Sequence, residues 1–127
     1  MTDTITLTIP ANEWMTSNGD RLHWAQVSER RRLLRYRAEI EARSQGVRKQ
    51  SGKVLAWIKV GYPTRASAAP QNAADTLKPI FDGLVKAGVL EDDSSDFLVP
   101  AYDRDPQKSP KGTHTVTITF VSQAVPF

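Results

Sequence analysis

Two segments of the chain alternate between apolar and polar residues, which is typical of a β-strand with one buried face. Residues 4–9 place isoleucine or leucine at every second position, and Pro10 follows. Residues 115–121 alternate in the same way. Residues 53–62 are rich in β-branched and aromatic side chains, which favours another strand in the same sheet. Residues 97–102 complete the set of predicted strands.

Apolar residues at helical spacing occur in two parts of the chain, the first between about residues 26 and 44. Val27, Leu34 and Ala38 recur there on one side, and arginines occupy much of the remainder. Gly46 is the predicted end, because glycine readily takes the left-handed conformation that terminates a helix. The pattern predicts a basic helix with one apolar stripe.

A second helix is predicted further along the chain and ends at Gly88. Pro79 lacks the N–H that a helix interior needs, so we expect the first turn to start near Asp75 or Thr76, either of which can act as N-cap. The core-facing stripe is formed by Leu77, Ile80, Phe81, Leu84 and Val85.

The order of these elements, β, α, β, α, β, β, predicts the fold class. Sequences of this kind form α+β domains, here with a mixed β-sheet and two main helices packed against it. A chain of 127 residues suits one compact domain, so we expect a single domain over residues 1–127.

The composition of the chain bears on where the protein is located and on which cofactors it can use. The chain has no cysteine, no apolar run near the ~20 residues that span a bilayer, and no basic and apolar start of the secretory type. We therefore expect a cytoplasmic protein without membrane contact. Nucleotide-binding and serine-hydrolase motifs are absent, which predicts no nucleotide cofactor, and two histidines are too few for a multi-histidine zinc site.

Charge is distributed unevenly along the chain. Residues 1–63 hold 11 Lys/Arg against 6 Asp/Glu, whereas residues 64–127 hold 6 against 8. A basic half beside an acidic half suits a protein that grips a polyanion and presents metal ions to it. The alternative is a solvated helix face, or a basic helix that binds an acidic protein partner. The candidate DNA contacts are Arg21, His23, Arg30, Arg31, Arg35 and Arg43, whereas Trp24 is expected in the core.

The second helix carries charged residues on its polar face. Asp75, Lys78 and Asp82 are three or four residues apart and share that face. Asp75 and Lys78 stand near the helix start, where free N–H groups and the helix dipole favour an anion such as phosphate. The plain alternative is a solvated stripe of ion pairs.

An acidic turn follows that helix. Four carboxylates lie within six residues there, and adjacent acids repel one another unless a cation is present. A hard divalent ion with oxygen ligands would remove the repulsion, although exposed acidic turns without metal are common. The acids are Glu91, Asp92, Asp93 and Asp96.

Residues 78–93, K-P-I-F-D-G-L-V-K-A-G-V-L-E-D-D, resemble the core of the RusA-type Holliday-junction resolvases. The signature of that family is D-x-D-N-x-x-K-x-x-x-D-A-L, then A-G, then a final D-D. In this register Lys78 takes the place of the family's catalytic lysine, Asp82 that of a structural acid, and Asp93 that of a metal-site acid. The similarity extends weakly over most of the chain, and only the central segment is specific.

The same register places the family's D-x-D-N on residues 72–75, which read Asn, Ala, Ala and Asp. Both leading aspartates are therefore absent. The resemblance implies a RusA-like fold and a site for Mg²⁺ or Mn²⁺, with Lys78, Asp93 and Asp75 in catalysis. The implied metal ligands are Asp75, Asp93, Asp92 and Asn72.

The resemblance also implies a function. RusA-type resolvases act as homodimers that embrace a four-way DNA junction and cut two strands with the help of Mg²⁺, which stabilises the attacking and leaving oxygens at phosphorus. Three hypotheses follow. The first is a Mg²⁺-dependent, structure-selective endonuclease. The second is a resolvase-like protein that binds branched DNA with weak or no cleavage, because the leading aspartates are missing. The third is a protein-interaction domain.

Overall fold

The computed structural model describes residues 1–16, 23–64 and 69–123. Its elements follow the predicted order, with one short 3₁₀ helix, η1, added before the second main helix. They are β1 (Thr4–Pro10), α1 (Trp24–Ser44), β2 (Val54–Gly61), η1 (Pro70–Ala73), α2 (Ala74–Lys86), β3 (Leu98–Arg104) and β4 (Thr113–Ser122).

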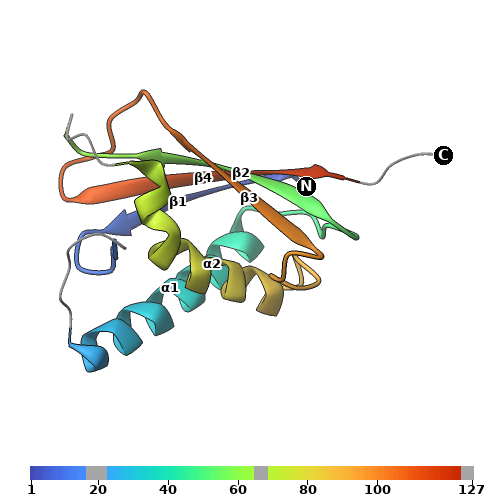
Figure 1. Cartoon of the computed structure of the whole chain (residues 1–127), viewed down its shortest axis with the longest axis horizontal. Helices are drawn as coiled ribbons and strands as arrows, with labels where there is room; N and C mark the ends of the chain where they lie inside the picture. The colour runs from blue at the N-terminus through green and yellow to red at the C-terminus, as the bar shows by residue number, and fades with distance from the viewer. Residues whose placement is uncertain (17–22, 65–68, 124–127) are drawn as a thin grey trace.

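The strands form one four-stranded sheet in the order β1-β4-β2-β3. Strand β4 runs antiparallel to both β1 and β2, whereas β3 runs parallel to β2. Both main helices lie against the same face of the sheet (Figure 1). The predicted α+β fold, with a mixed sheet and two packed helices, is confirmed.

The core lies between the sheet and the two helices. Alternation in β1 buries Ile5, Leu7 and Ile9, and each such side chain contributes about 1.5–3 kcal/mol on full burial. The apolar stripe of α2 is buried as predicted, except that Val85 is only half-buried. On α1 the predicted positions Leu34 and Ala38 are fully buried.

The start of α2 differs from the prediction. The helix begins at Ala74, because η1 supplies a preceding helical turn, and no side chain caps it. Thr76 is not an N-cap: its hydroxyl donates to the Met15 carbonyl (2.6 Å) and accepts from the Met15 N–H (2.8 Å). The assignment of Asp75 or Thr76 as N-cap is therefore wrong, and Pro79 lies inside the helix rather than in its first turn.

A close approach fixes α1 against α2. Gly83 of α2 faces the backbone carbonyl of Arg35 and the Cβ of Ala38, and a methyl group on Gly83 would collide with both. This contact leaves the polar face of α2 beside the arginine-bearing part of α1. The sequence places glycine at a point where a side chain on α2 would collide with α1.

The start of α1 corrects one prediction. Trp24 is 76% exposed rather than buried in the core, because it lies at the first position of α1, at the end of that helix that slants away from the sheet (Figure 1). His23 is the N-cap: its ring Nδ1 accepts a hydrogen bond from the N–H of Ala25, and Gln26 completes a capping box.

The other face of the sheet carries three exposed apolar side chains, Trp57, Val99 and Val121. Lys59 lies over the ring of Trp57, 4.7 Å from its centroid. Among the described residues, no helix is long and apolar enough to cross a membrane.

Candidate functional site

A tight turn returns the chain to the polar face of α2. Gly88 takes a positive φ of 81° just after the helix, and Val89 donates to the carbonyl of Leu84 (2.9 Å). Val89 and Leu90 are both buried, which anchors the turn in the core. The acidic residues that follow are therefore held beside the helix that precedes them.

The site is a cluster of Lys78, Asp82 and Asp93, which we call the lysine cluster. The Lys78 ammonium donates a hydrogen bond to Oδ2 of Asp93 across 15 residues of sequence and lies 3.7 Å from Oδ1 of Asp82. The Lys78 side chain is 66% exposed, and that of Asp93 only 19%. The fold thus brings Lys78 and Asp93, two of the residues that the resemblance places in catalysis, into direct contact.

Proton affinities in the lysine cluster follow from these contacts. The hydrogen bond from Lys78 holds the pKa of Asp93 below its ordinary value, and the same contact raises the pKa of Lys78. Partial burial raises the pKa of Asp82, and a hydrogen bond between the two carboxyl groups adds to that rise. Proton binding by one of these two carboxyl groups therefore affects proton binding by the other. The ammonium of Lys78 contacts both groups and supplies the cation that partly neutralises them.

Asp93 stands between two surface pockets. One, of about 230 Å³, is partly apolar, and we call it the lysine pocket. The other, of about 440 Å³, brings residues of α1 and α2 to the acidic turn, and we call it the arginine pocket. The lysine pocket is lined by Ala74, Lys78, Phe81, Asp93, Leu98, Pro100 and Tyr102. The arginine pocket is lined by Arg35, Asp82, Val85, Lys86, Asp92 and Asp93.

The other metal ligands implied by the resemblance differ in whether they line the two pockets. Asp92 adjoins Asp93, accepts a hydrogen bond from the Asp93 N–H (2.8 Å) and lines the arginine pocket. Asp75 is exposed in the first turn of α2, and Asn72 lies on η1; neither lines the lysine pocket or the arginine pocket. The structure therefore pairs Asp93 with Asp82 rather than with Asp75.

The predicted DNA contacts are spread along α1. Arg35 lines the arginine pocket, and Arg31 is exposed. Arg30 donates to the Trp14 carbonyl (2.5 Å), so its guanidinium also ties α1 to the preceding loop. Arg43 forms an ion pair with Glu39 (3.1 Å) in the last turn. His23 is exposed at the helix start, whereas Arg21 lies outside the described residues.

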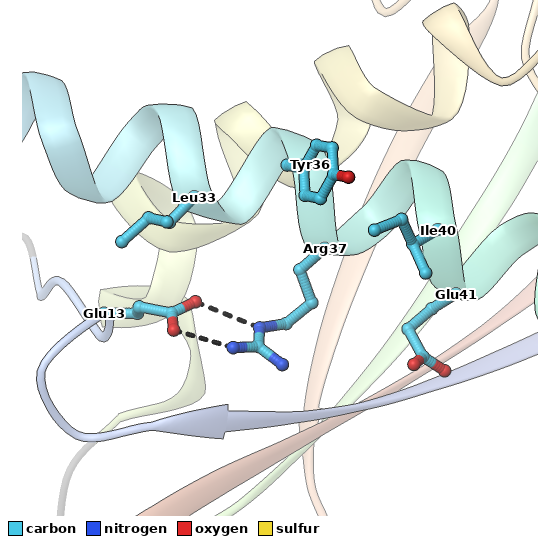
Figure 2. Close-up of a pocket in the computed structure, with 6 residues that line it drawn as sticks. All are labelled: Glu13, Leu33, Tyr36, Arg37, Ile40 and Glu41. Carbon is cyan, nitrogen blue, oxygen red and sulfur yellow. Dashed lines mark hydrogen bonds and ion pairs between the residues drawn. The ribbon is translucent and has the colours of Figure 1, made fainter.

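A third pocket, of about 250 Å³, lies beside α1 and is shown in Figure 2. Arg37 donates from two nitrogens to the two carboxylate oxygens of Glu13, at 3.0 and 2.7 Å. Glu13 is only 7% exposed, and its hydrogen bond raises the pKa of Arg37. Such a bidentate pair neutralises both charges, so we assign it a structural role that joins the loop after β1 to α1.

The lysine cluster provides donors that suit magnesium. Mg²⁺ takes oxygen ligands and commonly binds through one or two carboxylates plus the phosphates of a substrate. Asp82 and Asp93 supply such a carboxylate pair, with Asp92 beside them. Within residues 1–16, 23–64 and 69–123, no group of three or more His, Cys, Asp or Glu side chains gathers as a metal site. Two carboxylates alone would leave most of the coordination of such an ion to other oxygen ligands, such as those of a phosphate.

Two comparisons with known proteins identified no relative of this chain. Neither a scan against models of protein families nor a search of curated proteins finds a match to this chain. The resemblance to RusA-type resolvases therefore rests on the residues from Lys78 to Asp93 and stays a prediction.

Asp82 was predicted as a structural acid on the same helix face as Lys78 and not as a metal ligand, and the apolar lining of the lysine pocket was not predicted. The sequence shows that Asp82 is four residues from Lys78, but the same spacing fits a solvated ion pair, and only the fold brings Asp93 to them. Phe81 and Tyr102 join the lysine pocket from α2 and β3. No spacing signal connects Tyr102 with Lys78, because strand β3 reaches the site through the sheet.

Proposed function

We propose that this protein is a Mg²⁺-dependent endonuclease that acts on branched DNA such as four-way junctions. The observation that carries the proposal is the contact between Lys78 and Asp93. These two residues close the segment that resembles the RusA-type resolvases, and their contact gives one cation and one carboxylate a common position. A phosphodiester placed there meets both groups.

Each residue of the lysine cluster has a role in this proposal. Asp93 and Asp82 would hold the divalent ion, which when bound would stabilise the charge on the oxygens that attack and leave phosphorus. Lys78 donates to a non-bridging phosphate oxygen and stabilises the added charge of the pentacovalent transition state. Asp92 orients Asp93, because its carboxylate accepts the Asp93 N–H.

DNA binding is assigned to the basic side of α1. Arg35 lies in the arginine pocket next to the carboxylates, and Arg31 stands exposed one turn before it. Guanidinium groups bind backbone phosphates without reading sequence, which fits a protein that selects the shape of DNA. These arginines also offset the negative charge of the acidic turn, so that a polyanion can approach it.

The test uses a labelled synthetic four-way junction with and without Mg²⁺ or Mn²⁺. We expect nicks that require the metal, and a loss of at least about a hundredfold in rate for Asp93→Asn, the scale on which lost transition-state stabilisation appears. The matched control is Asp96→Asn, which removes an exposed carboxylate from the same turn. Undiminished cutting by Asp93→Asn would remove Asp93 from the mechanism.

A second candidate function is favoured by Ala74. This residue lines the lysine pocket, at a position where the resolvase signature has an aspartate. A protein without that acid can bind junctions and leave them intact. In that case the wild type shifts junctions in a gel at low salt, where phosphate contacts are strongest, but yields no product with any divalent ion.

The homodimer is part of the same proposal. A dimer would present two lysine clusters to the two strands that a junction resolvase cuts. Light scattering with size-exclusion chromatography measures the mass of the protein in solution, and a mass of one 14.1 kDa chain at high concentration would contradict the dimer.

A further inference from the structure

The Lys78 ammonium lies where a divalent cation would compete with it. It contacts Asp93 directly and Asp82 at 3.7 Å, so it neutralises the same two carboxylates to which the metal ion is assigned. A cation that approaches Asp93 while the ammonium is bound to it is repelled by that ammonium, because like charges repel, so the two compete for the carboxylate.

We propose that the ion pair between Lys78 and Asp93 is a latch, which withholds Asp93 from the divalent ion until a DNA phosphate draws Lys78 away. The proposal rests on the proposed function and adds an order of events to it. DNA binds first, Lys78 transfers its hydrogen bond from carboxylate to phosphate, and Asp93 becomes available to the ion. No covalent bond changes in this step.

Exposure and flexibility make Lys78 the moving partner of the latch. Its side chain is 66% exposed and has a long flexible stem, whereas Asp93 is 19% exposed and tied to Asp92 through its own N–H. An ion pair at a surface is weak, so a phosphate that carries a full negative charge can replace the carboxylate. Asp93 then keeps its place when Lys78 leaves.

The position of the two pockets supports the exchange. Lys78 and Asp93 both line the lysine pocket, so the ammonium can move into that space without crossing another element. Asp93 also lines the arginine pocket, where Arg35 and Lys86 supply cationic groups for a phosphate. These groups lie beside the three carboxylates of the pocket, those of Asp82, Asp92 and Asp93. A DNA backbone that enters either pocket meets the latch.

The first experiment measures Mn²⁺ binding to the free protein by electron paramagnetic resonance. We expect Lys78→Met to bind Mn²⁺ about two- to fivefold more tightly than the wild type, the range set by the strength of an exposed ion pair. The matched control is Lys86→Met, which removes the same charge from the same helix and lines the arginine pocket, but has no part in the latch. It should change the affinity clearly less.

The second experiment measures the affinity for a labelled junction with and without Ca²⁺ at constant ionic strength. Because coupling between two ligands is reciprocal, a metal site that DNA opens must tighten DNA binding by the same factor. Ca²⁺ should tighten junction binding more in the wild type than in Lys78→Met. Unfolding midpoints of both lysine variants verify that they remain folded.

The outcomes separate the latch from the proposed function. Equal Mn²⁺ affinities for Lys78→Met and Lys86→Met, with saturable binding to the wild type, reject the latch and leave the metal site intact. A loss of Mn²⁺ binding in Asp93→Asn supports the site assignment. Absence of saturable binding to the wild type and to Lys78→Met, with and without junction DNA, rejects the latch and the proposed metal dependence together.

Discussion

Lys78 and Asp93 form an ion pair between the middle of α2 and the acidic turn that follows the helix. The turn at Gly88 and the buried residues Val89 and Leu90 bring the two side chains together. The electrostatic repulsion among the turn's carboxylates is thereby reduced by a residue of the protein itself. A divalent ion at this site would act on a cluster that is already partly neutralised.

Replacement of Ala74 by aspartate should strengthen the metal site. Ala74 lines the lysine pocket with Lys78 and Asp93. A carboxylate at position 74 would therefore add an oxygen ligand to the two carboxylates, Asp82 and Asp93, that are assigned to the ion. We expect Ala74→Asp to raise the affinity for Mn²⁺ and the rate of junction cleavage by at least about tenfold each. Ala74→Asn is the control, since it has the same shape without the charge. Equal behaviour of the two variants would show that position 74 does not reach the ion.

Arg35 should matter more for junction binding than Arg43. Arg35 lines the arginine pocket, whereas Arg43 pairs with Glu39 at the far end of α1. Loss of one phosphate contact weakens binding about uniformly across sequences and lowers the salt slope by about one. We expect this of Arg35→Met and a smaller effect of Arg43→Met, measured by fluorescence anisotropy over a range of salt concentrations. Equal salt slopes would place the DNA elsewhere.

Local patterns predicted most of the fold. The alternation in β1 and the helical stripe of α2 depend on neighbouring residues, so their faces and approximate bounds follow from the sequence. Trp24 and the start of α2 were predicted wrongly for reasons that lie outside local sequence. The first depends on how α1 is inclined to the sheet (Figure 1), and the second on η1 and the hydrogen bonds of Thr76 with Met15.

The candidate site was predictable only in part. Lys78 and Asp93 are named by the motif, and their contact follows once the turn at Gly88 forms. The pairing of Asp82 with Asp93 depends on the rotation of α2 against the turn, which no spacing rule fixes. Tyr102 reaches the lysine pocket through the parallel pairing of β3 with β2, a long-range contact.

Gly83 should be sensitive to the addition of a single methyl group. Its position faces the Arg35 carbonyl and the Ala38 side chain, so Gly83→Ala must push α1 away from α2. Overpacking of this kind costs about 1–3 kcal/mol in the free energy of unfolding, which urea denaturation measures. Gly88→Ala meets open space and is strained only by its positive φ, at a cost of about 1 kcal/mol. A smaller loss for Gly83→Ala than for Gly88→Ala would contradict the close helix contact.

The ion pair of Glu13 and Arg37 should stabilise the fold as a unit. Arg37→Met leaves the buried Glu13 carboxylate without its two hydrogen bonds, which should lower the free energy of unfolding by about 1–3 kcal/mol. The variant with both Glu13→Leu and Arg37→Met removes both charges and should recover much of that loss. Leu33 and Ile40 beside the pair offer an apolar surface to the new side chains (Figure 2). Additive losses in the double-mutant cycle would show that the two side chains do not interact.

His114 should make the stability of the fold depend on pH. Its ring stacks on Trp14 at 4.1 Å, meets Tyr62 edge-on, and has a buried Nδ1 without a hydrogen-bond partner among the described residues. Burial lowers the pKa of His114, so the folded state resists the proton that the unfolded chain takes up below about pH 6.5.

The sign of this pH dependence follows from linkage. Where the unfolded state binds more protons, the free energy of unfolding rises with pH. The contribution of His114 is therefore fully present above about pH 6.5 and is lost as the pH falls toward the lowered pKa of the folded state. Urea denaturation between about pH 5 and 7 should show this slope in the wild type, and both His114→Phe and His114→Gln should flatten it. If both variants keep the wild-type slope, another group binds the proton and His114 is not its source.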